Sequence, residues 1–231
     1  MTINTEKLEQ LSKIVTKYKS QLEQINQELT QFPYETIFNN QLEKPSNNLK
    51  GIIVMDNPGD EEKVQGQYLV GQAGKVFNKE LTSIGVKRED VLVFNKSAIT
   101  THGTNDLCSI YKNEQLKEIF LKEQHITFDT IKEISLLLNI PVMVHGYAAY
   151  LKKGKHFTQN EKGNRPLFTF FKKLQENQKE MKNMTHFYKH SSYGNLSKQI
   201  KAHCTLLEKE SLNFEEYLEL GKANCEGFFT E

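Results

Sequence analysis

Four short apolar runs, each followed at once by polar or turn-forming residues, constrain the fold of this chain most strongly. They span residues 51–55 (GIIVM), 91–94 (VLVF), 141–144 (PVMV) and 185–188 (THFY). A continuous apolar run of this length is typical of a strand that is covered on both faces, as in a parallel sheet. Segments with helical periodicity separate the runs. Between the first and third runs they predict helices at 73–84, 114–123 and 130–139, the last capped by Asp129, with loops at 60–71 and 96–113. The sequence therefore predicts an α/β fold, a three-layer α/β/α sandwich with a central four-stranded parallel sheet.

A long amphipathic segment precedes the first run. Residues 5–31 place apolar side chains three and four positions apart, which predicts a helix. Residues 32–49 contain two prolines and several asparagines, a composition typical of a linker or irregular loop. We expect residues 1–49 to form an N-terminal amphipathic helix and linker packed on the domain, and residues 50–231 to form that domain. An oligomerisation helix is the alternative, and the oligomeric state stays open.

Composition limits the classes of site. The formal net charge is +1, and only two of the 30 basic residues are arginine, so contacts to a phosphate backbone would come from lysines or main-chain amides. The three cysteines, Cys108, Cys204 and Cys225, form no C-x-x-C pair, so we expect no metal site and no cofactor. The chain shows no leader pattern and no apolar run near the roughly 18 residues that span a bilayer, which predicts a cytoplasmic protein without a membrane partner.

Polar residues stand at the end of every predicted strand. The first run ends in the turn Asp56-Asn57-Pro58-Gly59, the second in Asn95, the third in His145-Gly146 and the fourth in His190-Ser191-Ser192. Ligands of parallel sheets bind at the carboxyl ends of the strands. The sequence therefore predicts a binding site built from these four turns.

The stretch from Val54 to Asn95 resembles the uracil-DNA glycosylase superfamily, especially its family 4 and related bacterial members. The later PVMVHGYAA resembles the third strand of that superfamily, and His190-Ser191-Ser192 stands where its H-P-S motif would stand. The positions kept in register in the first stretch are Pro58, Gly59, Glu61, Gly66, Val70, Gly71, Ala73, Gly74, Ile84, Gly85, Arg88, Glu89, Val91 and Asn95.

The resemblance implies an enzyme that hydrolyses the N-glycosidic bond of a flipped-out uracil or other deaminated base in DNA, without a metal or cofactor. It assigns catalysis to three residues. Asp56 and Asn57 would lie in the water-activating turn, where Asp56 is the only carboxylate and Asn57 could orient water. His190 would donate a hydrogen bond to uracil O2 and stabilise the departing anion.

The resemblance also implies how base and DNA would be held. Asn95 would read the Watson–Crick edge of the base with one donor and one acceptor. The remaining base-binding residues would be Pro58, Gly59, Tyr68 and Leu69. Ser191, Ser192 and Tyr193 would belong to a loop that enters the minor groove of DNA.

The chain departs from the family pattern at several positions. Met55 replaces a glycine, and Leu69 replaces the stacking phenylalanine unless Tyr68 swings in. Ser191 replaces a proline, His145 replaces a leucine, and the iron–sulfur cysteines of family 4 are absent. These departures keep an alternative open: a catalytically weak or inactive glycosylase-fold module that binds nucleic acid or a nucleobase. A third possibility is an interaction protein that works through its first helix.

Overall fold

The computed structural model describes residues 3–147, 151–152, 156–157, 165–191 and 194–229. Its main sheet contains the four predicted strands, β1 (Gly51–Met55), β2 (Val91–Asn95), β3 (Val142–His145) and β6 (Thr185–Tyr188). All neighbours pair in parallel, in the order β2-β1-β3-β6. A separate two-stranded antiparallel pair joins β4 (Leu151–Lys152) to β5 (His156–Phe157). The predicted parallel sheet is confirmed.

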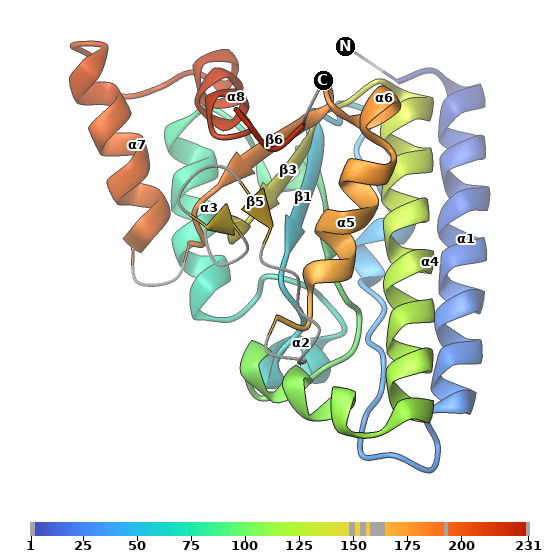
Figure 1. The fold of residues 1–231 in the computed structure, drawn as a ribbon. Helices are drawn as coiled ribbons and strands as arrows, with labels where there is room; N and C mark the ends of the chain where they lie inside the picture. Colours follow the sequence, from blue (N-terminus) through green and yellow to red (C-terminus); the bar gives the residue numbers. More distant parts are fainter. Residues whose placement is uncertain (1–2, 148–150, 153–155, 158–164, 192–193, 230–231) are drawn as a thin grey trace.

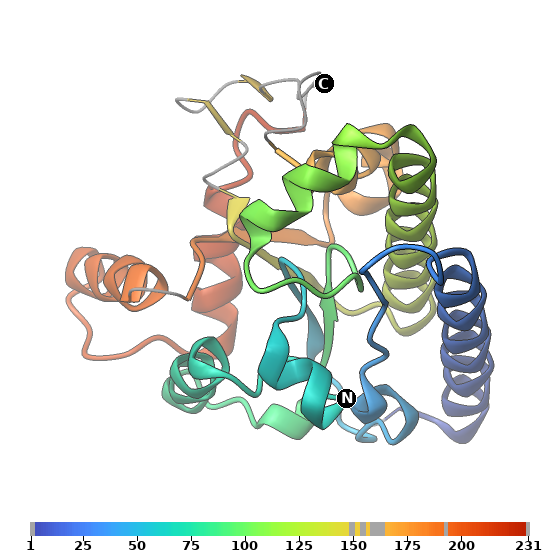
Figure 2. The ribbon, with the colours of Figure 1, turned by 90° about the horizontal axis from the view of Figure 1, so that it is seen from below.

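Helices cover both faces of this sheet (Figures 1 and 2). One side carries α1 (Thr5–Glu28), α4 (Glu114–Leu138) and α5 (Phe168–Glu176); the other carries α3 (Gln72–Ser83) and α7 (Asn195–Leu206). The remaining helical segments are η1 (Asn40–Glu43), α2 (Asp60–Gln65), η2 (Arg88–Asp90), η3 (Thr104–Lys112), α6 (Gln178–Met181) and α8 (Phe214–Ala223).

Alternation along each strand divides the core into two parts. Ile52 and Val54 belong to the cluster with α1, α4 and α5, whereas Ile53 and Met55 belong to the cluster with α3, α7 and α8. Successive strand side chains point to opposite faces, so an uninterrupted apolar run supplies both layers at once. The three-layer α/β/α arrangement follows from this pattern and agrees with the sequence prediction.

The helix predictions need three corrections. The helices predicted at 114–123 and 130–139 are one continuous helix, α4, and Asp129 lies inside it rather than capping a second helix. No proline or glycine interrupts residues 124–129, and Thr127 and Phe128 continue the buried face. Residues 60–71, expected as a loop, begin with α2, where three acidic residues at the first turn favour a helix. The loop expected at 96–113 contains η3.

The first helix lies beside α4 (Figure 1). Its buried residues, Leu11, Val15, Tyr18, Leu22 and Ile25, share one core cluster with β1 and α4. The Tyr18 hydroxyl is 3.0 Å from Oγ1 of Thr127 on α4. The predicted N-terminal helix is therefore packed against the rest of the chain; a domain boundary at residue 49 stays a prediction.

A buried carboxyl group connects α4 to the segment after β2. Glu123 accepts hydrogen bonds from Ser97 Oγ at 2.6 Å, the Ala98 amide at 2.8 Å and Thr127 Oγ1 at 2.7 Å. The side chain is fully buried, and burial raises its pKa to about 7 despite these three donors. Glu123 thus fixes the chain that immediately follows Asn95.

We expect Glu123→Gln to remove part of the pH dependence of stability. The pKa of Glu123 is raised on folding, so its protonated form favours the folded state, and this contribution is lost as pH rises from about 4.5 through 7. As the pH is raised from 5 to 8, the unfolding free energy of the variant minus that of wild type should increase by about 2–3 kcal/mol. Urea unfolding at both pH values measures this gain. Glu118→Gln, on the exposed face of the same helix, should show no such gain.

Candidate active site

The carboxyl ends of β1, β2 and β6 bring three of the predicted site residues, Asp56, Asn95 and His190, to one pocket. Met55 lies opposite Asn95 in the β1–β2 register, and the ladder continues beyond it. The Lys96 amide donates to the Met55 carbonyl at 2.8 Å, and the Ser97 amide to the Asp56 carbonyl at 3.2 Å. This continuation places Asp56 beside Lys96, directly after the central strand β1 and the edge strand β2.

A pocket of about 450 Å³ opens at this edge of the sheet. Six predicted residues contribute to its wall: Asp56, Asn57, Gly59, Leu69, Asn95 and His190. The other lining residues are Met55, Asp60, Glu61, Glu62, Gly71, Gln72, Ala73, Thr101, His102, Gly103 and Thr104. The structure therefore joins the turn after β1, the end of β2 and the turn after β6 in one cavity.

Asp56 lies at the centre of this arrangement. One carboxylate oxygen, Oδ1, accepts a hydrogen bond from Nζ of the buried Lys96, and the other, Oδ2, lies 3.8 Å from Nε2 of His190. The Asp56 side chain is 21% exposed. Gly146 leaves room for it, since a Cβ there would lie 2.9 Å from Oδ1, and its φ of +80° favours glycine. A carboxylate held in this way can accept a hydrogen bond from water in the pocket.

Asn57 also lines the pocket, but its amide is largely engaged. Its Nδ2 donates to Thr101 Oγ1 at 2.9 Å and to the Pro58 carbonyl at 3.2 Å, and its Oδ1 accepts from Thr104 Oγ1 at 2.8 Å. Both amide hydrogens are used, and one lone pair of Oδ1 remains. Asn57 therefore connects residues 101–104 to the turn after β1 by hydrogen bonds.

The end of β2 contributes Asn95. Its side chain is almost fully buried, lines the pocket and has no hydrogen-bond partner among the residues that the structure describes. Its amide atoms are not fully buried: they reach the solvent of the pocket, where they offer one donor group and one acceptor. Asn95 is thus ready to pair with a ligand that presents the complementary pattern.

The residues after α2 place Leu69, not Tyr68, at the pocket. Tyr68 is fully buried, and its hydroxyl donates to the Ile37 carbonyl, whereas Leu69 adopts a left-handed φ of 55° and lines the cavity. Gly74 allows this, because a Cβ there would lie 1.9 Å from the Leu69 carbonyl oxygen. Of the two arrangements left open by the sequence, the structure has the one with Leu69 at the pocket. Pro58 is buried and lies outside the lining.

His190 follows β6 by two residues and reaches the pocket from the edge strand. Its side chain is 28% exposed. Burial lowers its pKa, the Asp56 carboxylate partly offsets that effect, and the Lys96 ammonium adds to it. The ring is therefore largely neutral at pH 7 and can offer one N–H to a ligand atom.

Part of the chain is similar to known proteins. The family model described as the Uracil DNA glycosylase superfamily matches residues 43–130. A segment of 44 residues, 19% of this chain, is 43% identical to the Type-4 uracil-DNA glycosylase of Archaeoglobus fulgidus. The family match covers the strands β1 and β2 and the segments that follow them, which is less than half of the chain. The matched segment spans 22%, about a fifth, of the length of that curated relative.

The segment matched by the family model, residues 43–130, supplies the turn after β1 and the end of β2. Arg88, one of the family positions, donates from Nη2 to the Tyr68 carbonyl at 2.8 Å and so fixes the loop that carries Leu69. His190 lies outside the matched segment and joins the site only through the sheet. The matched segment therefore contains two of the three strand ends that line the pocket, and the third lies outside it.

Two residues beside the site received no functional role from the sequence. Lys96 was expected at the start of a polar loop, yet its side chain is fully buried behind Asp56. His145, for which the sequence offered no role, presents its carbonyl to Lys96 Nζ at 2.5 Å. Its ring packs edge-on to Phe77 and stacks on Tyr188, and burial lowers its pKa to about 3. The sequence feature that could have revealed Lys96 is its position directly after a buried strand.

The cysteines do not form a ligand set. Cys204 packs in the cluster with α3 and α7, Cys225 in the cluster on the opposite face, and all three thiols are free. In the described part of the chain, no group of three His, Cys, Asp or Glu could hold a metal ion. These residues therefore do not fit an iron–sulfur cluster. Within the same residues, no helix is long and apolar enough to cross a membrane.

The loop after His190 is only partly described. Ser191 is fully buried, and its Oγ has no hydrogen-bond partner in the described residues. Ser192 and Tyr193 lie outside the described residues. A role of these three residues in DNA binding stays a prediction.

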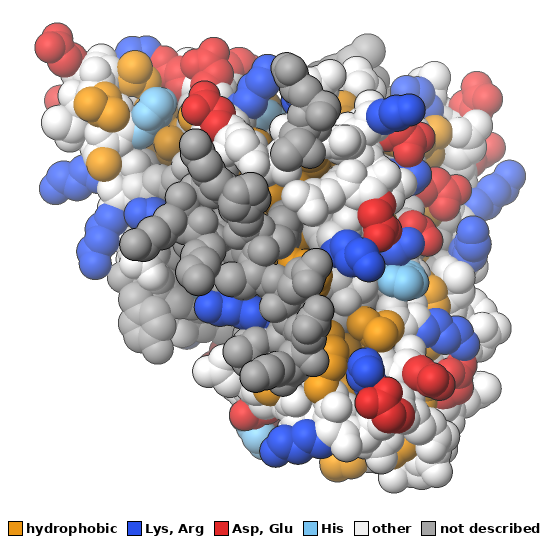
Figure 3. Space-filling model, viewed as in Figure 1, with side chains coloured by type: hydrophobic (Ala, Val, Ile, Leu, Met, Phe, Trp, Pro, Cys, Tyr) orange, Lys and Arg blue, Asp and Glu red, His pale blue; other side chains and the backbone are white. Residues whose placement is uncertain are grey.

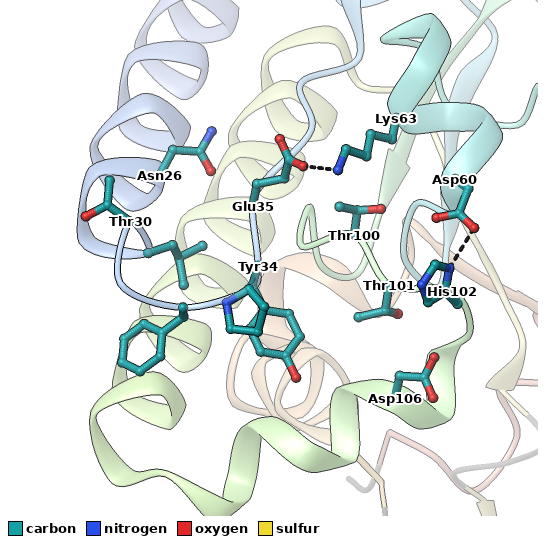
Figure 4. A pocket seen from close by; sticks show the side chains of 13 residues that line it. Asn26, Thr30, Tyr34, Glu35, Asp60, Lys63, Thr100, Thr101, His102 and Asp106 are labelled. Carbon is teal, nitrogen blue, oxygen red and sulfur yellow. Dashed lines mark hydrogen bonds and ion pairs between the residues drawn. The ribbon is translucent and has the colours of Figure 1, made fainter.

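A second pocket of about 760 Å³ adjoins the first and shares Asp60, Thr101 and His102 with it (Figure 4). His102 Nδ1 lies 2.7 Å from Asp60 Oδ2, and Lys63 forms an ion pair with Glu35. The hydrogen bond to Asp60 raises the pKa of His102. Most charged groups of this second pocket are thus paired with one another.

Proposed function

We propose that this protein is a DNA glycosylase-like hydrolase that cleaves the N-glycosidic bond of a flipped-out uracil or another deaminated base in DNA. The observation that carries the proposal is the convergence of Asp56, Asn95 and His190 on one pocket from three different strand ends. The superfamily segment over residues 43–130 supports it. Uracil is the base in the name of the Archaeoglobus fulgidus relative, and its recognition by this chain is part of the proposal.

The three side chains match the charges that develop in this reaction. As the bond between the sugar C1′ and the base nitrogen breaks, the electron pair stays with the base and positive charge builds on the sugar. His190 donates a hydrogen bond to the base oxygen that becomes negative. Asp56 accepts the proton of the water whose oxygen bonds to C1′. Asn95 pairs with the edge of the base and selects it.

The surface offers lysines for a phosphate backbone next to this site. In Figure 3 lysine and arginine side chains gather at the left edge, over α7. On this helix Lys198 and Lys201 are exposed and form no ion pair with described residues. Because α7 begins at Asn195, five residues after His190, we infer that its lysines are available to a DNA strand at the pocket.

A second candidate function is a binding module with little or no turnover. Two observations favour it: Leu69 stands at the pocket where a stacking ring would stand, and the Asn57 amide is engaged within the protein. Stacking of a base on an aromatic ring is worth roughly 1–3 kcal/mol, so a leucine weakens capture of the base. Such a module would bind oligonucleotides in a salt-sensitive manner without releasing a base.

Labelled oligonucleotides that carry uracil, hypoxanthine or xanthine distinguish the two functions. The protein is incubated with single strands and with mismatched duplexes, and the products are treated with alkali. We expect strand cleavage at the position of one of these bases. The same oligonucleotide with the ordinary base is the substrate control, and the Asp56→Asn protein excludes a contaminating enzyme. Salt-sensitive binding without cleavage on every substrate would support the binding module instead.

A further inference from the structure

Lys96 occupies an unusual position for a lysine. It follows β2 directly, its side chain has an exposed fraction of 0%, and its Nζ donates to Asp56 and to the His145 carbonyl. The same nitrogen lies 5.5 Å from the centre of the Phe171 ring. A carboxylate, a carbonyl oxygen and a ring face all favour the ammonium form, whereas burial opposes it and lowers the pKa of this lysine.

The fold alone gives no reason for an ammonium group here. The strands on either side are filled with apolar residues, and a buried ion pair often stabilises a protein no more than well-packed apolar side chains do. Lys96 also does not line the pocket, so it does not touch a bound base. Its contact with Asp56 is the one that reaches the site.

This contact restricts the Asp56 carboxylate on several sides. Lys96 holds Oδ1, the main chain of Asp56 is bound by the Ser97 amide, and Gly146 lies against the carboxylate. The Lys96 ammonium is itself held by the His145 carbonyl at the end of β3. The remaining oxygen, Oδ2, is left on the side of His190 and the pocket.

We propose that Lys96 is the positioning residue of the site: it fixes the Asp56 carboxylate so that Oδ2 accepts a hydrogen bond from the attacking water. This inference rests on the proposed glycosylase function. A lysine in this role acts only through Asp56, and a misplaced carboxylate reduces the rate of bond cleavage without weakening the capture of DNA.

Four proteins test the proposal on the best oligonucleotide substrate: wild type, Lys96→Met, Asp56→Asn and the double variant. Methionine has nearly the length of lysine and suits a buried position. We expect Lys96→Met to lower kcat about 10- to 100-fold with KM changed less than about twofold. In the Asp56→Asn background the same substitution should change kcat less than about twofold, because the group it positions is already gone. Lys179→Met, an exposed lysine on α6, is the matched control.

Two results would overturn the positioning role. One is an equal loss of kcat from Lys96→Met with and without Asp56. The other is a covalent adduct, trapped by borohydride with uracil-containing DNA and absent in Lys96→Met, which would make Lys96 an amine nucleophile. If Lys96→Met does not fold, Lys96→Gln removes the charge but keeps amide hydrogens, and the same comparison with Asp56→Asn applies.

Urea unfolding separates failure of this inference from failure of the proposed function. Asp56→Asn leaves a buried ammonium without its counter-charge, so the double variant with Lys96→Met should unfold at a higher urea concentration than Asp56→Asn alone. A wild-type protein inactive on every substrate removes the glycosylase proposal and, with it, the positioning role. The unfolding comparison then still shows whether the two side chains interact. If the changes in urea midpoint of the two single variants add up in the double variant, the pairing itself is contradicted.

Discussion

Replacing Asp56 by asparagine should lower the rate of base release about 10²- to 10⁴-fold, the range expected for loss of a proton acceptor. Asparagine is nearly isosteric, and its amide oxygen can still accept the hydrogen bond from Lys96. The pocket should therefore keep its shape while water loses the carboxylate. Single-turnover cleavage of the labelled oligonucleotide measures the effect.

Asp129→Asn provides the matched control for this prediction. Asp129 is exposed on α4, and the same chemical change there should leave the rate unchanged. Circular dichroism and the urea midpoint verify that the Asp56 variant is folded. A folded Asp56→Asn protein with wild-type turnover would remove Asp56 from the reaction, and Asn57, whose Oδ1 keeps one lone pair, would become the candidate for orienting water.

Replacing His190 by alanine should reduce the rate about 10²- to 10³-fold, as observed when one donor to a developing anion is removed. The imidazole is largely neutral at pH 7 because burial lowers its pKa, so it acts as an N–H donor and not as a cation. The loss should appear in kcat, since the interaction strengthens as the base becomes negative. Single-turnover rates at saturating protein provide this measurement.

His190→Gln distinguishes hydrogen bonding from simple loss of volume. Glutamine keeps an N–H donor, so part of the lost rate should return relative to alanine. His125→Ala, an exposed histidine on α4, is the control and should behave like wild type. If His190→Ala raises KM and leaves kcat unchanged, His190 binds the base equally in ground and transition states, and another group must stabilise the anion.

The sequence predicted the sheet because its strands are short, apolar on both faces and separated by helical patterns. Asp56, Asn95 and His190 could be predicted as site residues for the same reason, since each stands at or just after a strand end. The continuous α4 was missed because polar residues within 124–129 interrupt its apolar pattern, while packing against the sheet and α1 buries several of them. Lys96 and Glu123 were missed because lysine and glutamate are usually exposed, and only a tertiary partner makes their burial possible.

The sequence by itself determined the α/β fold and the turns that could carry chemistry, because strand burial and turn formation depend on local residue types. Tertiary structure decided which turn residues meet and what each can still bind. It buried the Tyr68 ring and placed Leu69 at the pocket, engaged the amide of Asn57 and left that of Asn95 free. It also set Lys96 behind Asp56. These choices depend on distances between residues far apart in the chain, which residue patterns along the chain do not encode.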